Sequence, residues 1–191
     1  MSTVKSKKLQ VGTDATSSNN FTIYQPSTPD GTLRIGVGNA DSPTEVGRFD
    51  SNGYVATNAP TFSAYASSAV SLTANVSTKM AMNVEEWDTN SNYDTTNYRF
   101  TPTVAGYYQF NGTVQYNNDT DGYLILYKNG SVAKYGYLAD NRPSYIATIS
   151  TMLYCNGTTD YVELYAVSTS TVNSQVGSSL TTFNGFLARA V

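Results

Sequence analysis

The stretch GYYQFNGTVQY, residues 106–116, alternates apolar and polar side chains along its length. One face of the extended chain would carry Tyr108, Phe110, Gly112, Val114 and Tyr116. The opposite face would carry Gln109, Asn111, Thr113 and Gln115. A period of two is typical of a β-strand with one buried and one polar face. The pattern therefore predicts a strand whose Tyr108 face lies against a hydrophobic core.

Similar runs continue outward to the end of the chain, namely YLILYKNG, VAKYGYLA, YIATISTMLYC, YVELYAV and LTTFNGFLARA. Asn129-Gly130 and Asn156-Gly157 separate some of these runs and are strong turn signals. The polar stretch Asn117 to Gly122 reads as another turn between two strands. Many strands at short spacing with polar turns indicate an all-β sandwich or jelly roll.

The first 59 residues also contain short strand-like runs, at Phe21–Tyr24, Leu33–Val37 and Val46–Phe49, separated by turn formers. These runs hold too few apolar side chains to close a core of their own. We therefore expect this β-rich arm to find its apolar partners in the following domain, in sister chains or in a larger particle. A boundary near TNAP, residues 57–60, divides the chain into an arm, residues 1–59, and a head, residues 60–191.

The composition restricts the class of partner. Only 13% of the residues are charged, and the net charge is -3. The chain contains 16 tyrosines. A nucleic-acid-binding protein normally has a basic face, so we expect no nucleic acid partner. A surface poor in charge tolerates packing against copies of itself. Lys5, Lys7 and Lys8 form the one basic cluster, which is either a solvated tail or a docking site for an acidic protein surface.

Several kinds of chemistry are disfavoured. The chain has no His and a single Cys, Cys155, which excludes Ser-His-Asp and Cys-His catalysis, the usual zinc sites and an intrachain disulfide. Glu85, Glu86 and Asp88 are the best local carboxylates for a glycosidase pair, but their stretch reads more simply as a strand end entering a polar loop. We therefore expect that the protein is not an enzyme and has no cofactor. We also expect no membrane insertion, since no apolar run could span a bilayer.

The alternating oxygens of Asn117, Asp119 and Asp121 before Gly122 resemble the front half of a calcium loop. An EF-hand loop requires a bidentate Glu at its twelfth position. If Asn117 is the first position, the twelfth is Lys128, whose side chain is a cation. The stretches on either side also read as strands, so the sequence predicts no EF-hand calcium site in this loop. A cation held by oxygens from several chains around an axis remains an open alternative.

Trp87, Tyr93 and Tyr98 lie in and near one polar stretch, VEEWDTNSNYDTTN, and could act as platforms for a sugar. Aromatic rings beside amides and carboxylates are what carbohydrate binding generally requires. The alternative for each of these rings is ordinary packing in a core.

The series PTFSAYASS, RFTPTVAGYYQFNGTV, LYKNG, STMLYCNGTTDYVELYA and TFNGFLARA, spread over residues 61–191, resembles the C1q-like globular head, a relative of the tumour-necrosis-factor jelly roll. The resemblance implies two antiparallel sheets and a tight homotrimer. It also implies that certain aromatic residues pack in the core or at the trimer interface; the candidates are Tyr108, Phe110, Tyr161, Tyr165, Phe183 and Phe186. Of the two rows that alternate along residues 161–166, one is expected to face the sister chains.

The arm, notably LRIGVGNADSPTEVGRFDSNGYV, resembles strand-and-turn segments of bacteriophage fibres and appendages. Together the two resemblances predict a non-enzymatic, homotrimeric virion protein, assembled in the host cytoplasm and located on the virion surface. It would be a capsid decoration or cement protein that docks on a major capsid protein or tail component through its arm. The alternative is a short tail or head fibre whose head binds a host surface glycan.

Overall fold

The computed structural model describes residues 8–16, 19–51, 53–56, 59–136 and 145–191. The chain forms two compact units, Met1–Asn58 and Ala59–Val191, which we call the arm and the head. The secondary-structure elements of both units are β-strands.

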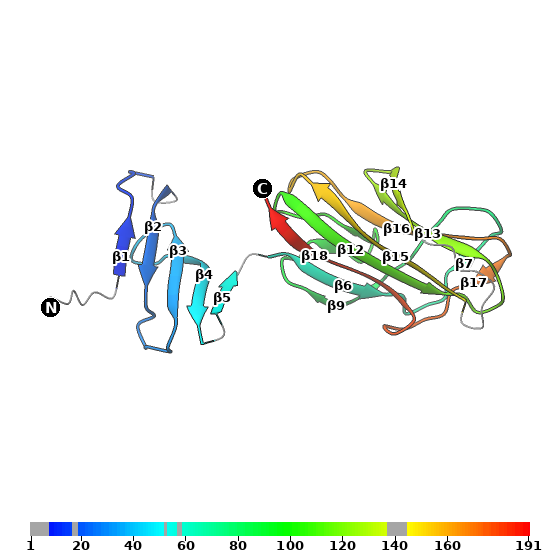
Figure 1. Ribbon diagram of the computed structural model, residues 1–191, viewed down its shortest axis with the longest axis horizontal. Coiled ribbons are helices and arrows are strands. Elements are labelled where there is room, and N and C mark those ends of the chain that lie inside the picture. The colour runs from blue at the N-terminus through cyan, green and yellow to red at the C-terminus, as the bar shows by residue number, and fades with distance from the viewer. Residues whose placement is uncertain (1–7, 17–18, 52, 57–58, 137–144) are drawn as a thin grey trace. The chain divides into compact units, whose positions relative to one another are not determined.

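The arm is a single antiparallel sheet in which each strand pairs with the next along the chain (Figure 1). Its strands are β1 (Lys8–Val11), β2 (Phe21–Tyr24), β3 (Leu33–Val37), β4 (Thr44–Asp50) and β5 (Gly53–Ala56). The predicted bounds of β2 and β3 are confirmed, and β4 extends the predicted strand at both ends. The edge strands β1 and β5 had not been predicted.

The head contains two larger sheets. The first, which we call the β12 sheet, has the order β15-β12-β18-β6-β9. Its strands are β15 (Ile146–Cys155), β12 (Gly106–Gln115), β18 (Thr181–Ala190), β6 (Thr61–Tyr65) and β9 (Val84–Asp88). Strands distant in the sequence therefore lie side by side in it (Figure 1).

The second sheet, which we call the β16 sheet, has the order β10-β11-β16-β13-β14, and β8 also pairs with β16. Its strands are β8 (Thr78–Lys79), β10 (Tyr93–Asp94), β11 (Arg99–Phe100), β13 (Gly122–Lys128), β14 (Ser131–Tyr135) and β16 (Val162–Ser168). A short pair, β7 (Ser71–Leu72) and β17 (Val172–Asn173), completes the head. The predicted all-β class with antiparallel sheets is confirmed.

Strand β12 alternates as predicted. Its inward residues, including Tyr108, Phe110 and Val114, are fully buried, and the outward residues between them are not. The buried hydroxyl of Tyr108 donates to the Val104 carbonyl at 2.7 Å, so this ring enters the core without losing its hydrogen bond. Beyond β12, strand β13 begins at Gly122, which confirms that the preceding polar stretch is a connection between strands.

The core of the head lies between the two large sheets. Phe62 of β6 is fully buried at its centre. Its ring centroid is 4.3 Å from that of Phe100, 5.0 Å from that of Phe183 and 5.1 Å from that of Tyr93. Aromatic rings from both sheets thus hold the layers together, because each ring contributes a large apolar surface to the same cluster.

Gly157 lies in the turn between β15 and β16, where the backbone has a positive φ and passes close to Ala105. Its φ is +73°, and an added Cβ would lie 2.4 Å from the backbone nitrogen of Ala105. Gly177 also has a positive φ, +108°, but no atom lies within 4 Å of its Cβ position. Gly177→Ala is therefore expected to cost about 1–2 kcal/mol for its left-handed backbone alone. Gly157→Ala should cost about 1–3 kcal/mol more for the added clash.

Urea unfolding of the head, with both variants compared to the wild type, measures this difference. Equal losses for the two variants would contradict the close approach of the Gly157 turn to Ala105.

Candidate functional site

The outer face of the β12 sheet carries large apolar side chains that remain exposed to solvent. The exposed fractions are 45% for Tyr107, 48% for Met152, 43% for Tyr154, 47% for Phe186 and 51% for Trp87. Singly scattered exposed apolar residues are ordinary, whereas a contiguous group of them marks an interaction surface. The register of the strands therefore decides whether these exposed side chains form one contiguous surface.

The strand register places these side chains in neighbouring rows. Tyr107 of β12 is the partner of Tyr154 of β15, and their ring centroids are 5.6 Å apart. In the next outward row, Gln109 of β12 lies between Met152 of β15 and Phe186 of β18. Directly paired residues share a face of the sheet, so these side chains form one patch rather than scattered sites.

Trp87 extends this patch toward the edge strand β9. Its indole Nε1 donates to the Thr61 hydroxyl at 3.3 Å, and Thr61 is the register partner of Phe186. We call the surface formed by Trp87, Tyr107, Met152, Tyr154 and Phe186 the aromatic patch.

A ladder of uncharged polar side chains continues from the patch along the same face. Gln109 donates to the Ser150 hydroxyl at 3.0 Å, and that hydroxyl donates to Asn111 Oδ1 at 2.9 Å. Asn111 Nδ2 in turn donates to Asn184 Oδ1 at 3.1 Å. Because these groups satisfy one another, another protein surface can cover this part of the sheet at a low desolvation cost.

The β15 side of the patch is fixed by the turns beside it. Lys128 Nζ donates to the Tyr154 carbonyl oxygen at 2.8 Å and lies 5.6 Å from the centroid of the Tyr154 ring. The same ammonium group pairs with Asp160 at 2.8 Å. Asn129 Nδ2 and the Asn156 N–H also donate to the Asp160 carboxylate, at 2.7 and 2.9 Å. Asp160 therefore joins two turns and the lysine that positions Tyr154.

This network predicts a pH dependence. Burial raises the pKa of the Asp160 carboxyl, but the hydrogen bonds from Lys128, Asn129 and Asn156 outweigh burial and hold that pKa below its ordinary value. A carboxylate with a lowered folded-state pKa stabilises the fold above its unfolded pKa, and this stability is lost as the pH falls through the folded value. We expect Asp160→Asn to be less stable than the wild type at neutral pH, with the difference shrinking below about pH 4.

Urea titrations of both forms across the acidic range measure this effect. A stability difference that stays constant through acid would contradict a role for the ionised carboxylate.

Comparisons with known proteins address the fold of the head. No protein-family model and no curated protein matches the sequence. Among solved structures, the globular domain of zebrafish complement 1qA protein matches with a TM-score of 0.51 and 18% identity, covering 69% of this chain and 98% of that one. Murine APRIL matches with a TM-score of 0.55 and 7% identity, covering 68% of this chain and 98% of that one.

Eiger TNF from S. frugiperda matches with a TM-score of 0.51 and 12% identity, covering 70% of this chain and 93% of that one. In each match, the share of this chain covered is close to the share that the head occupies. The head has the C1q and tumour-necrosis-factor jelly-roll fold. At these identities the likeness shows the fold alone, and it confirms the fold that the sequence of residues 61–191 had indicated.

The jelly-roll head assigns three of the predicted aromatic residues to its interior. Tyr108, Phe110 and Phe183 are fully buried between the two sheets. Phe186 does not lie in this interior, because 47% of its surface is exposed, and its alternative place at a trimer interface stays a prediction. Phe183 and Phe186 are an odd number of residues apart in β18, so a regular strand points their side chains to opposite faces.

The two rows of side chains that alternate along β16 lie on opposite faces of the sheet. Val162, Leu164 and Ala166 are fully buried. Tyr165, on the opposite row, lies with its ring centroid 4.0 Å from that of Tyr127, on the outer face of the β16 sheet. The Arg99 guanidinium lies 4.9 Å from the centroid of the Tyr161 ring.

The β16 sheet also contains an ion pair between its strands. Glu163 accepts from Lys79 Nζ at 2.5 Å. The outer face of the β16 sheet thus places charged groups among its tyrosines.

The predicted sugar platform is not assembled. Tyr93 is 7% exposed, and its hydroxyl donates to the Met82 carbonyl at 3.0 Å within the core, so its prediction as a glycan contact is wrong. Burial raises the pKa of this phenol far above its ordinary value. Tyr98 is partly buried and lies beyond β10, in a turn with φ +52°. Trp87 remains accessible as part of the aromatic patch.

The remaining candidates lie elsewhere. Lys5 and Lys7 fall outside the described residues. Lys8 begins β1 and pairs with Asp41 at 3.5 Å. Cys155 is fully buried, and burial raises the pKa of its thiol to about 11, so this side chain is protected from reagents in solution.

Within the ranges that the structure describes, no three His, Cys, Asp or Glu side chains gather as they would around a metal ion. Among the same residues, no helix has the length and apolar character needed to cross a membrane.

The sequence did not single out Tyr107, Met152 and Tyr154. A signal for Tyr107 was present, because the period of two that buries Tyr108 turns its neighbour outward. For Met152 and Tyr154 no such signal existed, since the residue between them, Leu153, is also apolar.

Proposed function

We propose that the chain is a non-enzymatic, homotrimeric structural protein of a bacteriophage virion, whose head associates through the outer face of the β12 sheet. The observation that supports the trimer is the aromatic patch on a jelly-roll head, with the uncharged ladder beside it. The outward residues of β12 and β15 include no charged side chain, and Arg189 of β18, the register partner of Tyr107, lies at one end of the face. A face that remained in water would normally carry charges, and their depletion together with exposed aromatic residues is typical of an interface core.

The dimensions of the face suit such an interface. β12, β15 and β18 contain 10 residues each. Three such strands present a surface about 34 Å by about 14 Å. This area of about 480 Å² is more than half of the roughly 800 Å² that one partner contributes to a standard interface, and β6 and β9 add to it. The five side chains of the aromatic patch, each about half exposed, would contribute about 1 kcal/mol apiece when covered.

The virion role draws on the division of the chain. The arm forms one thin sheet, and its sequence resembles segments of phage appendages. A capsid decoration or cement protein would use the arm to dock on a coat subunit and would project its trimeric head from the particle surface. Lys8, with Lys5 and Lys7 before it, would supply the basic contact to an acidic coat protein. Assembly would take place in the host cytoplasm.

Two measurements test this function. Sedimentation equilibrium of the purified chain is expected to give a trimer at micromolar concentration, and a monomer would remove the basis of the proposal. Cryo-electron microscopy of the virus that encodes the chain is expected to show trimeric density repeated at symmetry-related positions of the capsid. Density confined to the tail would exclude the cement role.

The second candidate is a short tail or head fibre that binds a host surface glycan. The observation in its favour is Trp87, which is 51% exposed on an edge strand and has Glu86 next to it in the sequence. In this role Trp87, at the β9 edge of the aromatic patch, would lie outside the trimer contact. A trimer would then present the site three times, so weak sites could give useful avidity.

A glycan screen discriminates between the two candidates. If the fibre role holds, the wild type and Tyr135→Ala will bind the same glycans and Trp87→Ala will not. Tyr135 is the control because it is 66% exposed on the other sheet. If none of the three forms binds a glycan, the cement role is the candidate that remains.

A further inference from the structure

The two faces of the arm sheet differ in chemical character. The register pairs Leu9 with Ile23, Ile23 with Ile35, and Leu33 with Phe49. Paired residues of neighbouring strands share a face, and residues two apart in one strand share it too. One face therefore collects apolar side chains from β1 to β4; they are Leu9, Val11, Phe21, Ile23, Leu33, Ile35, Val37 and Phe49. We call it the apolar face of the arm.

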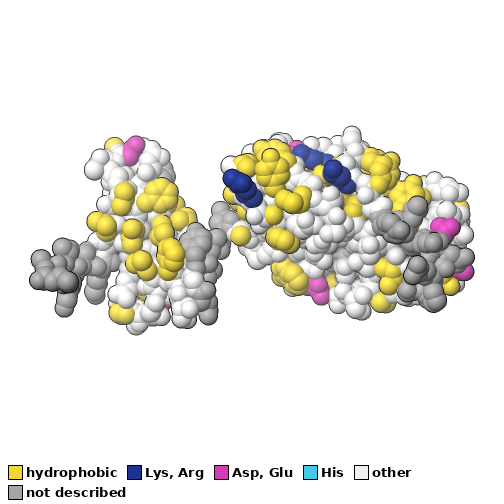
Figure 2. Space-filling model, viewed as in Figure 1, with side chains coloured by type: hydrophobic (Ala, Val, Ile, Leu, Met, Phe, Trp, Pro, Cys, Tyr) yellow, Lys and Arg dark blue, Asp and Glu magenta, His cyan; other side chains and the backbone are white. Residues whose placement is uncertain are grey.

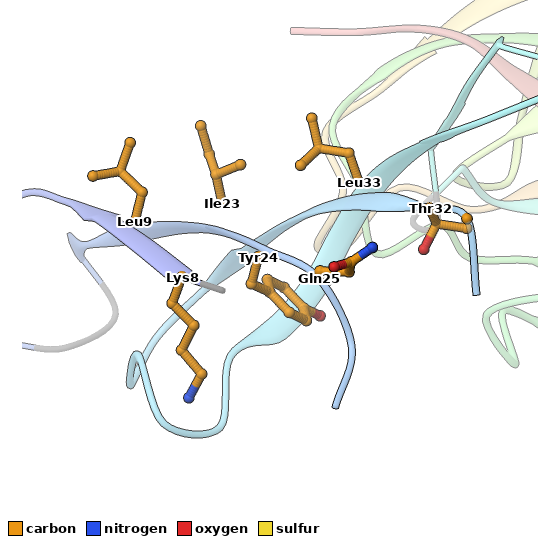
Figure 3. A pocket seen from close by; sticks show the side chains of 8 residues that line it. Lys8, Leu9, Ile23, Tyr24, Gln25, Thr32 and Leu33 are labelled. Carbon is orange, nitrogen blue, oxygen red and sulfur yellow. The ribbon is translucent and has the colours of Figure 1, made fainter. Parts of the chain in front are cut away.

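This face is open to solvent in the single chain. The exposed fractions are 59% for Leu9, 55% for Val11, 49% for Phe21, 49% for Leu33 and 47% for Phe49. Figure 2 shows hydrophobic side chains gathered over the visible face of the arm. A hollow of about 390 Å³ lies at one end of the sheet, and residues of β1, β2 and β3 line it. In Figure 3, the side chains of Leu9, Ile23 and Leu33 point to one side of the sheet and those of Lys8 and Tyr24 to the other.

Among the described strand residues, Lys8, Arg34, Glu45 and Arg48 lie on the opposite face, where they form ion pairs. Arg34 contacts Asp30 at 2.5 Å and Glu45 at 3.0 Å. Glu45 also accepts from Arg48 at 3.1 Å, and Lys8 pairs with Asp41 at 3.5 Å. The residues that form the apolar face include no charged side chain. A partner for that face therefore needs no complementary charge, and a copy of the same face meets this condition.

We infer that the apolar face of the arm packs against the same face of the arms of sister chains, so that the arms form a second oligomeric core. This inference rests on the homotrimer proposed above, because the heads would bring the arms together. One covalent chain joins each arm to its head, which makes the meeting of arms intramolecular, with an effective concentration on the order of millimolar.

The size of the face explains why the heads are required. Four strands of about five residues present a face about 19 Å by about 17 Å, or about 320 Å². That is less than half of the roughly 800 Å² that each partner contributes to a standard stable interface. The arm alone would then associate weakly, whereas three arms already held by their heads would be pushed together by the apolar surface they share.

Packing of this kind also assigns the two faces to different partners. The apolar face would lie inside the assembly, and the face that carries the Arg34 and Lys8 ion pairs would remain outside. A docking contact with a coat protein would then use charged groups on the outer face, not the hydrophobic side chains.

Neighbouring residues of β1 provide a matched test in the full chain. Leu9 and Gln10 are both exposed in the single chain and point to opposite faces. Leu9→Cys and Gln10→Cys would be labelled with a maleimide, and the buried Cys155 gives little background. We expect the cysteine at position 9 to react at least about tenfold more slowly than the cysteine at position 10. Leu33→Cys, nearer the middle of the sheet, should be protected at least as strongly.

The same labelling is repeated after adding Met152→Arg, which is designed to separate the heads. If protection depends on association, the cysteines at positions 9 and 33 should then react as fast as the one at position 10. Protection that persists in a monomeric chain would mean that the face is covered within one chain, which would overturn the inference.

Three further outcomes are distinguishable by sedimentation of the same samples. A trimer in which all three cysteines react alike overturns the inference and leaves the proposed function standing. A wild-type chain that sediments as a monomer removes the proposed function, and the inference fails with it. Protection that appears only when a coat or tail protein is added shows that this other protein covers the face, and it also overturns the inference.

Discussion

Met152→Arg is expected to convert the proposed trimer into monomers at micromolar concentration, with the head still folded. Met152 is 48% exposed in the single chain, in the row that also contains Gln109 and Phe186. An arginine can be solvated there in the monomer, so the folding of the head should change little. In the trimer the same guanidinium would lie in a region whose outward neighbours carry no charge to pair with it.

The expected effect is large because a buried unpaired charge costs about 3–5 kcal/mol. At 1.4 kcal/mol for each factor of ten, this loss weakens association about a hundredfold or more for each chain. Sedimentation equilibrium measures the change directly, and the urea midpoint of the head shows whether folding is preserved.

Val132→Arg is the matched control. Val132 is 44% exposed, close to the exposure of Met152, but lies in β14 of the other sheet. This variant is expected to remain trimeric. A trimer that survives Met152→Arg, or one that is lost equally in both variants, would contradict the assignment of the interface to the outer face of the β12 sheet.

Phe62→Ala is expected to destabilise the head by about 3–5 kcal/mol, the range for removing a fully buried phenylalanine. Its ring lies within 5.1 Å, between centroids, of the rings of Tyr93, Phe100 and Phe183. Truncation would leave a cavity among rigid rings from both sheets, which cannot collapse to fill it.

Chemical denaturation of the head measures this loss. Tyr135→Ala serves as the surface control, because 66% of Tyr135 is exposed, and it should change stability by no more than about 0.5 kcal/mol. A loss for Phe62→Ala of less than about 2 kcal/mol would show that the core can repack around the missing ring.

Much of the fold followed from local pattern. The period of two in residues 106–116 predicted strand β12 and its buried face, because one sheet face must lie against the core. Turn formers predicted the connections around β13 and before β16, since their side chains and backbone preferences act over a few residues. Short strands such as β8 and β11 were missed, because two residues carry no readable period.

The site was predicted less well than the fold. For Phe186 and Tyr93 the sequence left two alternative surroundings open, since an aromatic side chain is equally suited to a core and to an interface. Only the register of β18 beside β12 shows that Phe186 is in the outward row, and only the position of β10 beside β11 brings Tyr93 into the core. The prediction that the arm lacks a private core fits its open apolar face, but the sequence left the choice among three kinds of partner open.

The sequence by itself determined that this protein is built of strands, which residues alternate within them, and where the chain divides into an arm and a head. These properties depend on side-chain period, turn preference and composition, all of which are local. The tertiary structure decided which apolar residues face the core and which remain outside. It also brought Tyr107, Met152, Tyr154, Phe186 and Trp87 onto one surface. The physical reason is that strand pairing joins residues far apart in the chain, and pairing depends on the packing of the whole sheet.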